Sequence, residues 1–118
     1  MSETKEMREK KCEERIDNHL ESTILDFTHA LHEEWQDGEE YEDFIEWLNS
    51  YCLNYASDPH FRAMKLELSW GGPSDFFLFF DDGTIEYHFQ DWGDGAKREL
   101  YGNDLEIMSE VYDEYLNI

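Results

Sequence analysis

The hydrophobic pattern of the chain changes its period once, and this change most constrains the fold. From Ile16 to Trp35 the apolar residues recur every three or four positions, as on one face of an amphipathic helix. From Met64 to Trp70 they alternate with polar residues, as in a strand with one buried face. The sequence therefore predicts helices in the first half of the chain and an antiparallel sheet in the second.

The first half contains two helical segments separated by a break at Gly38. We expect the first helix to begin near Ser2–Thr4 and to end before Gly38, with residues 1–15 forming a solvated helical extension. Asp37-x-x-Glu40 resembles a capping box, and the second helix should then run until Asp58-Pro59, where proline disfavours continuation. A short connection favours an antiparallel helical hairpin over residues 16–57.

The second half is typical of a β-meander. The wholly apolar run Phe76–Phe80 predicts a central strand, and Ile85–Phe89 alternates as a third strand. Ala96–Leu100 predicts a short fourth strand, and Asn103-x-x-Glu106 opens a last helix. The expected fold is α+β in one domain of 118 residues: an N-terminal helical hairpin, a three- to four-stranded antiparallel sheet over residues 63–101, and a C-terminal helix over residues 103–116.

The charge of the chain is strongly unbalanced. Thirty Asp and Glu residues oppose nine Lys and Arg residues, which gives a formal charge of −21. Disorder is not expected, because 40% of the residues are hydrophobic and 16% are aromatic, enough to build a core. Nucleic acids and anionic membranes would repel such a surface, so we expect neither to bind the protein directly.

The acidic residues are concentrated where the predicted helices meet. Residues 32–47 (HEEWQDGEEYEDFIEW) hold eight carboxylates and no Lys or Arg. We assign Asp37 and Glu40 partly to capping and expect the other acids to have no local structural task. Over roughly 24 Å of helix the carboxylates average about 3 Å apart, close to the 3.4 Å spacing of phosphates along one DNA strand.

Two tryptophans flank glycine-rich turns, in SWGGPSD and DWGDG. Either they plug one end of the sheet beneath the helices, or they form an exposed aromatic patch rimmed by Asp75, Asp91 and Asp94. Taken together, the predicted partner-binding residues are Glu33, Glu34, Asp37, Glu39, Glu40, Glu42, Asp43, Glu46, Asp75, Asp91, Asp94, Trp70 and Trp92.

In size, charge density and lack of catalytic motifs, residues 16–118 resemble the small acidic DNA-mimic proteins of phages and mobile elements, including anti-restriction and anti-CRISPR inhibitors. The resemblance implies a non-enzymatic inhibitor whose carboxylates occupy the basic nucleic-acid-binding surface of a host defence nuclease complex. It implies no cofactor and a site of action in the cytoplasm of the host cell. Residues Leu66–Leu100 are separately similar to a module of uncharacterised prokaryotic and phage proteins, and that similarity implies no activity.

Three alternatives remain open. An antitoxin or immunity-type protein that neutralises another basic partner would have the same composition. A metal-dependent enzyme could use His29, His32 and Glu33, which converge on one face if the first helix continues through them. Halophilic adaptation also produces acidic surfaces, although this chain has only four Ala and many bulky aromatic residues.

Other candidate chemistry is weaker. Cys12 and Cys52 are too few and too far apart in sequence for a disulfide framework or a Cys-x-x-Cys metal site, which favours a reducing, intracellular environment. The acidic turns Asp81–Gly83 and Asp91–Gly95 do not match a calcium-binding loop. No catalytic residue is predicted, and the oligomeric state stays open.

Overall fold

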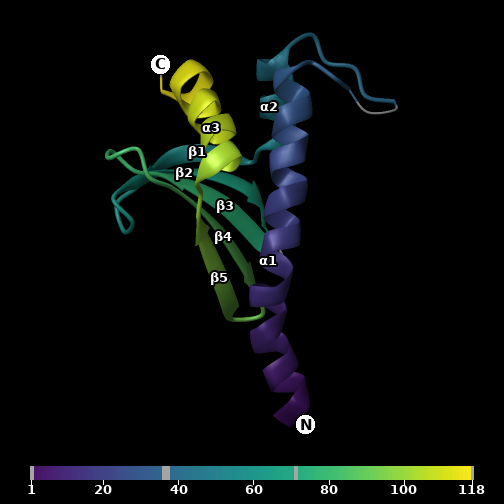
Figure 1. Ribbon diagram of the computed structural model, residues 1–118, viewed down its shortest axis with the longest axis vertical. Coiled ribbons are helices and arrows are strands. Elements are labelled where there is room, and N and C mark those ends of the chain that lie inside the picture. The colour runs from purple at the N-terminus through teal and green to yellow at the C-terminus, as the bar shows by residue number, and fades with distance from the viewer. Residues whose placement is uncertain (1, 36–37, 71, 118) are drawn as a thin grey trace.

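The computed structural model describes residues 2–35, 38–70 and 72–117 and has the expected α+β architecture (Figure 1). The helices lie on one side of an antiparallel sheet, and α1 runs along its whole length. In chain order the elements are α1 (Ser2–Leu31), α2 (Phe44–Tyr51), β1 (Asn54–Asp58), β2 (Ala63–Ser69), β3 (Ser74–Phe79), β4 (Ile85–Asp91), β5 (Asp94–Glu99), α3 (Gly102–Val111) and a π-helical turn (Tyr112–Leu116).

Helix α1 buries the stripe that the sequence predicts, but it ends earlier than expected. Ile16, Leu20, Ile24 and Phe27 are all buried against the sheet. The helix does end before Gly38, as predicted, but it already stops at Leu31, so the helical stripe expected as far as Trp35 is cut short. Its apolar period continues to Trp35, yet Trp35 packs on the core from the loop and not from the helix.

The second helix is shorter than predicted, and residues 54–58 from its predicted C-terminal part form an additional strand, β1. Helix α2 ends at Tyr51, after which the backbone of Cys52 is extended. The N–H of Leu53 donates to the carbonyl of Glu67 at 2.8 Å, and residues 54–58 then pair with β2. Tyr55 fits a helical period after Tyr51, but opposite Leu66 it also faces the core from a strand. Pairing with a distant strand overrides the local period here.

The sheet is a five-stranded antiparallel meander in the order β1-β2-β3-β4-β5. Strand β3, from the apolar run around Phe76–Phe79, is central as predicted. Leu66, Phe77 and Tyr87 lie opposite one another on adjacent strands and form one row of the buried face. Because β4 and β5 are joined through only Trp92 and Gly93, the register of the last hairpin is tightly fixed.

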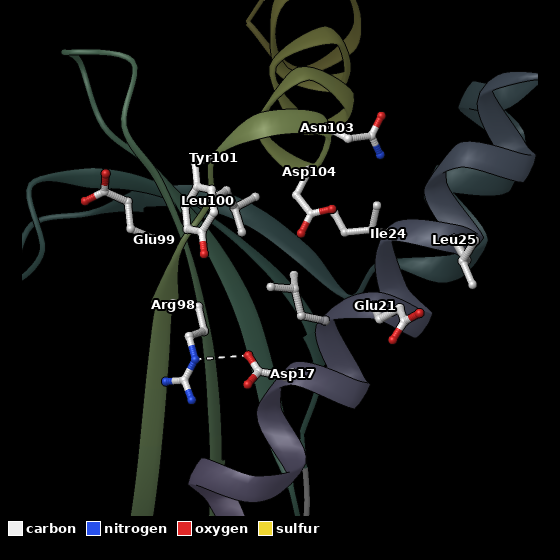
Figure 2. A pocket seen from close by; sticks show the side chains of 11 residues that line it. Asp17, Glu21, Ile24, Leu25, Arg98, Glu99, Leu100, Tyr101, Asn103 and Asp104 are labelled. Carbon is white, nitrogen blue, oxygen red and sulfur yellow. Dashed lines mark hydrogen bonds and ion pairs between the residues drawn. The ribbon is translucent and has the colours of Figure 1, made fainter.

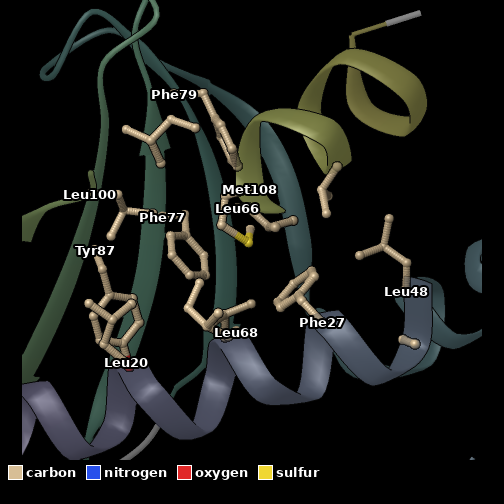
Figure 3. Packing of buried hydrophobic residues seen from close by; sticks show 14 of the residues in the cluster. Leu20, Phe27, Leu48, Leu66, Leu68, Phe77, Phe79, Tyr87, Leu100 and Met108 are labelled. Atoms are coloured by element: carbon tan, nitrogen blue, oxygen red, sulfur yellow. The ribbon is translucent and has the colours of Figure 1, made fainter. Parts of the chain in front are cut away.

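The main core lies between the sheet and the helices (Figure 3). Phe27 is fully buried, and its ring lies 5.0 Å from that of Trp47, 5.6 Å from that of Tyr51 and 6.0 Å from that of Phe77. One side chain of α1 therefore joins α1, α2 and β3. Met108 and Val111 of α3 close the same core and are fully buried.

The other face of the sheet carries a smaller apolar cluster. Phe76 and Leu78, which alternate with the core residues of β3, are buried there with Ala63. The His88 ring stacks on Phe76 at 4.8 Å, and Lys65 Nζ lies 4.3 Å above the same ring. Within the described part of the chain, no helix is both long enough and apolar enough to cross a membrane.

Candidate protein-binding surface

The chain reverses after α1 through a helix-ending motif that places acidic side chains outward. The N–H of Glu34 donates to the carbonyl of His29, and the N–H of Glu33 donates to that of Ala30, at 2.8 and 2.9 Å. This pair of bonds is the Schellman motif, with Glu33 in the left-handed position (φ 54°) that glycine usually occupies. The motif ends α1 and begins the loop that carries most of the predicted partner-binding acids.

All the predicted acids of this loop that the structure describes are exposed. We call them the acidic corner: Glu33, Glu34, Glu39, Glu40, Glu42, Asp43 and Glu46. Asp37 lies outside the described residues. The corner follows the C-terminal end of α1 and leads into α2 (Figure 1).

Three of the corner acids do have a local structural task, contrary to expectation. Asp43 is the N-cap of α2, and its carboxylate accepts from the N–H of Glu46 at 3.0 Å. The Glu46 carboxylate accepts in turn from the N–H of Glu42 at 2.7 Å. Glu34 lies 3.3 Å from Nδ1 of His29. The second helix is thus capped by Asp43, and its predicted start from a capping box at Asp37-x-x-Glu40 is wrong.

The C-terminal helix extends the acidic corner. The ring of Tyr115 packs on that of Phe44 at 4.5 Å, which brings the last turns of the chain to the start of α2. Burial raises the pKa of the Tyr115 hydroxyl, and the negative charges of Glu114, Glu110, Glu33 and Asp43 raise it further. Acids far apart in sequence therefore act on one point of the surface.

Glu110 and Glu114 are exposed and were not predicted as partner-binding residues. Their signal in the sequence is an acidic pair four residues apart within residues 99–118, which hold six acids and no Lys or Arg. That signal could not say which part of the surface they join, because only packing of Tyr115 on Phe44 decides it.

A layer of packed aromatic side chains lies next to the corner. Trp47 stacks on Tyr51 at 4.5 Å, and the hydroxyl of Tyr51 donates to Asp26 at 2.8 Å. Trp35 packs edge-on against Tyr41 at 5.1 Å. A small hollow of about 90 Å³ opens between these rings and the carboxylates of Glu34 and Glu39. The exposed charges are thus held on packed side chains and on a capped helix.

The candidate metal ligands do not form a site. Because α1 ends at Leu31, His32 and Glu33 lie in the turn beyond it, and the helical spacing that would bring them to His29 is lost. In the described ranges, no three His, Cys, Asp or Glu side chains are grouped so that they could hold a metal ion.

The cysteines lack the properties of nucleophiles. Burial raises the pKa of Cys12 to about 11, with a further contribution from its hydrogen bond to Asp94. Burial, and then the charge of Asp75, raise the pKa of Cys52 to about 12. Both thiols are therefore protonated at neutral pH.

Both tryptophans of the glycine-rich turns are exposed, so the interpretation that they plug the sheet is wrong. Trp70 is 63% exposed and Trp92 is 79% exposed. The indole N–H of Trp70 donates to Glu67 at 2.6 Å. The loop after β2 and the turn after β4 meet at one end of the sheet, where Gly72 and Trp92 line the same hollow.

The three aspartates predicted to rim this patch are partly buried instead of exposed. Asp75 points to the core side, where its carboxylate accepts from the hydroxyls of Ser69 and Tyr87. Asp91 pairs with Arg15 of α1 at 2.9 Å. Asp91 and Asp94 still line the hollow beside Trp92, whereas Asp75 does not.

A groove between α1 and the start of α3 separates these two regions (Figure 2). It has a volume of about 410 Å³ and a buried apolar floor of Leu20, Ile24 and Leu100. Leu25 and Tyr101 stand exposed beside it. The only cation among its lining residues, Arg98, is bound to the carboxylates of Asp17 and Glu13, so the groove is acidic as well.

Comparison of the chain with protein-family models, with curated proteins and with solved structures finds no match. The arguments for function therefore rest on the geometry and charge of the described residues.

Proposed function

We propose that the protein is a non-enzymatic inhibitor that presents the acidic corner to the basic nucleic-acid-binding surface of another protein, such as a nuclease complex of host defence. One observation carries the proposal: Tyr115 packs on Phe44 at the start of α2, and there the C-terminal acids Glu110 and Glu114 come near the corner acids Glu33 and Asp43. Four corner acids, Glu33, Glu39, Glu40 and Glu42, have side chains that make no hydrogen bond or ion pair with another described residue, unlike Glu34, Asp43 and Glu46, and this leaves their full charge for a partner.

The distribution of cations supports this orientation. Among the described side chains, Arg15 pairs with Asp91, Lys65 with Asp58 and Glu67, and Arg98 with Glu13 and Asp17. These pairs lie on the sheet and on the N-terminal half of α1, away from the corner. Self-repulsion at the corner costs stability, and a basic partner would remove that cost on binding.

The test begins with capture of the partner. The immobilised protein is exposed to host lysate at low salt, bound proteins are eluted with a salt gradient, and the basic nucleic-acid-binding protein that elutes is identified and purified. Labelled cognate DNA or RNA is then displaced from that partner by the acidic protein, followed by fluorescence anisotropy. If about seven ion pairs form, affinity should fall by roughly a thousandfold between about 50 and 200 mM salt.

The decisive variant reverses Glu39, Glu40 and Glu42 to Lys. These side chains cap nothing, so the fold should persist while affinity falls by about 100-fold, because like charges then face each other across the interface. The matched control reverses Glu14, Asp81 and Glu106, which are exposed and outside the corner and give the same change in net charge.

Two results would contradict the proposal. One is a corner variant that displaces nucleic acid as well as the unchanged protein does. The other is a partner that binds the acidic protein and its nucleic acid together, which would favour the antitoxin or immunity-type alternative.

A further inference from the structure

The groove between α1 and the start of α3 has an apolar floor and apolar side chains at its edges (Figure 2). Leu20, Ile24 and Leu100 form the floor and are buried. Leu25 of α1 and Tyr101, which precedes α3, also line the groove but are 51% and 81% exposed. Large apolar side chains exposed around a hollow are typical of a docking site. An occupant that covers these edges as well as the floor must extend beyond the hollow, as a segment of a protein chain does.

Tyr101 contributes little to the fold at this position. It is the N-cap residue of α3, and its side chain makes no capping hydrogen bond. A Ser, Thr, Asp or Asn side chain would stabilise the helix there. Neither capping nor burial therefore explains a tyrosine at this position. Tyrosine is, however, among the residues that most often dominate the binding free energy of a protein interface.

The groove also carries an excess of negative charge. Four carboxylates and one guanidinium line it. The guanidinium, that of Arg98, is already paired with Asp17 and with Glu13. Glu21 and Asp104 line the groove from α1 and from α3, and no described residue forms a hydrogen bond or an ion pair with either carboxylate.

Asp104 is half-buried and carries a charge that the fold disfavours. Burial, and then the negative charge of Glu21, raise the pKa of the Asp104 carboxyl. The two carboxylates thus repel each other at an apolar floor. A cationic group bound between them would remove this repulsion and would give the half-buried carboxylate a donor. The groove is therefore complementary to an occupant that is both basic and apolar.

We propose that the groove is the docking site for a basic segment of a protein partner. One large apolar side chain of the segment lies on the floor, between Leu25 and Tyr101. Lys or Arg residues beside it in the segment pair with Glu21 and Asp104. A nucleic acid would be repelled by the carboxylates, and so would a second copy of this chain, which carries a formal charge of −21.

This docking site goes beyond the proposed function and does not rest on it. Of the described acids that form the acidic corner, none lines the groove. At about 150 mM salt, charges more than about 8 Å apart are largely screened. Under these conditions, reversal of Glu39, Glu40 and Glu42 should leave docking at the groove unchanged, whatever it does to the displacement of nucleic acid. The two proposals therefore fail independently.

The experiment titrates the methyl-labelled protein with the peptide acetyl-Lys-Lys-Phe-Lys-Lys-amide in the same buffer. NMR follows the methyl resonances of Leu20, Ile24 and Leu100. One matched peptide carries Ala in place of Phe, and another carries Glu in place of every Lys. We expect saturable shifts of the floor methyl groups with the first peptide, binding weaker by about tenfold with the Ala peptide, and no saturable shift with the acidic peptide.

Variants of the protein separate binding from stability. Glu21→Gln combined with Asp104→Asn should weaken peptide binding by about tenfold. It should not lower the melting temperature, because the fold disfavours the charge of Asp104. The matched control, Glu14→Gln combined with Glu106→Gln, removes the same charge at exposed positions outside the groove and should bind the peptide as the unchanged protein does.

Tyr101→Ser tests the apolar contact. Serine can cap α3, so the helix should persist while peptide binding weakens by about tenfold. Equal binding of the Phe and Ala peptides, or shifts confined to methyl groups outside the groove, would overturn the proposal. So would equal binding by the groove variant and its matched control. A dimer in solution that Tyr101→Ser dissociates would identify a second copy as the occupant and would also overturn it.

Discussion

The end of helix α1 can be tested with one substitution. Two possible positions for this end predict changes of opposite sign in the free energy of unfolding. In the structure, Glu33 is the left-handed residue of a Schellman motif. If α1 instead continued towards Gly38, as its apolar period suggests, Glu33 would be an interior helical residue. The substitution Glu33→Gly separates the two.

The magnitude follows from the backbone. A left-handed conformation costs an L-residue roughly 1–2 kcal/mol, and glycine avoids that cost. Glycine also gives the unfolded chain more freedom, which offsets about 0.4–1 kcal/mol. We therefore expect Glu33→Gly to raise the free energy of unfolding by about 0.5–1 kcal/mol. In a continuous helix the same change would lower it by about 1 kcal/mol.

Urea denaturation followed by circular dichroism measures this difference, with an unchanged denaturant slope as the check that both chains unfold alike. The control is Glu33→Gln, which removes the same charge beside Glu110 and Glu114 but keeps a Cβ in the left-handed position. Glu33→Gly should be more stable than Glu33→Gln. A glycine variant less stable than the glutamine variant would refute the Schellman assignment.

Three further predictions concern stability. Asp43→Ala should lower the free energy of unfolding by about 1 kcal/mol in urea titrations, whereas Asp43→Asn, which preserves the N-cap, should change it little. Phe27→Ala, at the junction of α1, α2 and β3, should cost about 3–5 kcal/mol by the same measurement, and a loss below 1 kcal/mol would contradict the packing. Burial, and then the charge of Glu21, raise the pKa of Asp104, so its ionised form is disfavoured in the folded state. Calorimetry should therefore show a higher melting temperature for Asp104→Asn at pH 7, and this gain should vanish below pH 3.8, the usual aspartate pKa.

Local patterns predicted most elements of the fold. The stripe from Ile16 to Phe27, the apolar run of β3 and the alternation of β4 each depend on neighbours in sequence, so composition and period are enough. They failed at Tyr55, whose spacing fits both a helix and a strand. The segment became a strand because the N–H of Leu53 donates to the carbonyl of Glu67 and the following residues pair with β2, which is distant in sequence.

In the candidate surface, too, some features follow from local sequence and others depend on tertiary contacts. Exposure of the corner acids was predictable, since so many carboxylates without a base cannot be buried. The N-cap was placed at the wrong residue, because Asp37 and Asp43 both precede a glutamate by three positions and only the end of α1 fixes where the next helix starts. The sequence left open whether Trp92 is buried or exposed, because its exposure depends on a two-residue turn between paired strands.

Local sequence patterns were enough to predict the α+β class, the order of helices and meander, and a negative surface concentrated near residues 33–46. Tertiary structure alone decided that α1 ends at Leu31, that residues 54–58 become a strand, and that Glu110 and Glu114 join the acidic corner. The physical reason is the separation in sequence between the residues that set each property. Hydrophobic period and charge density are properties of neighbouring residues, whereas strand pairing, ring packing such as that of Tyr115 on Phe44, and the hydrogen bonds that end a helix depend on which distant groups the folded chain brings together.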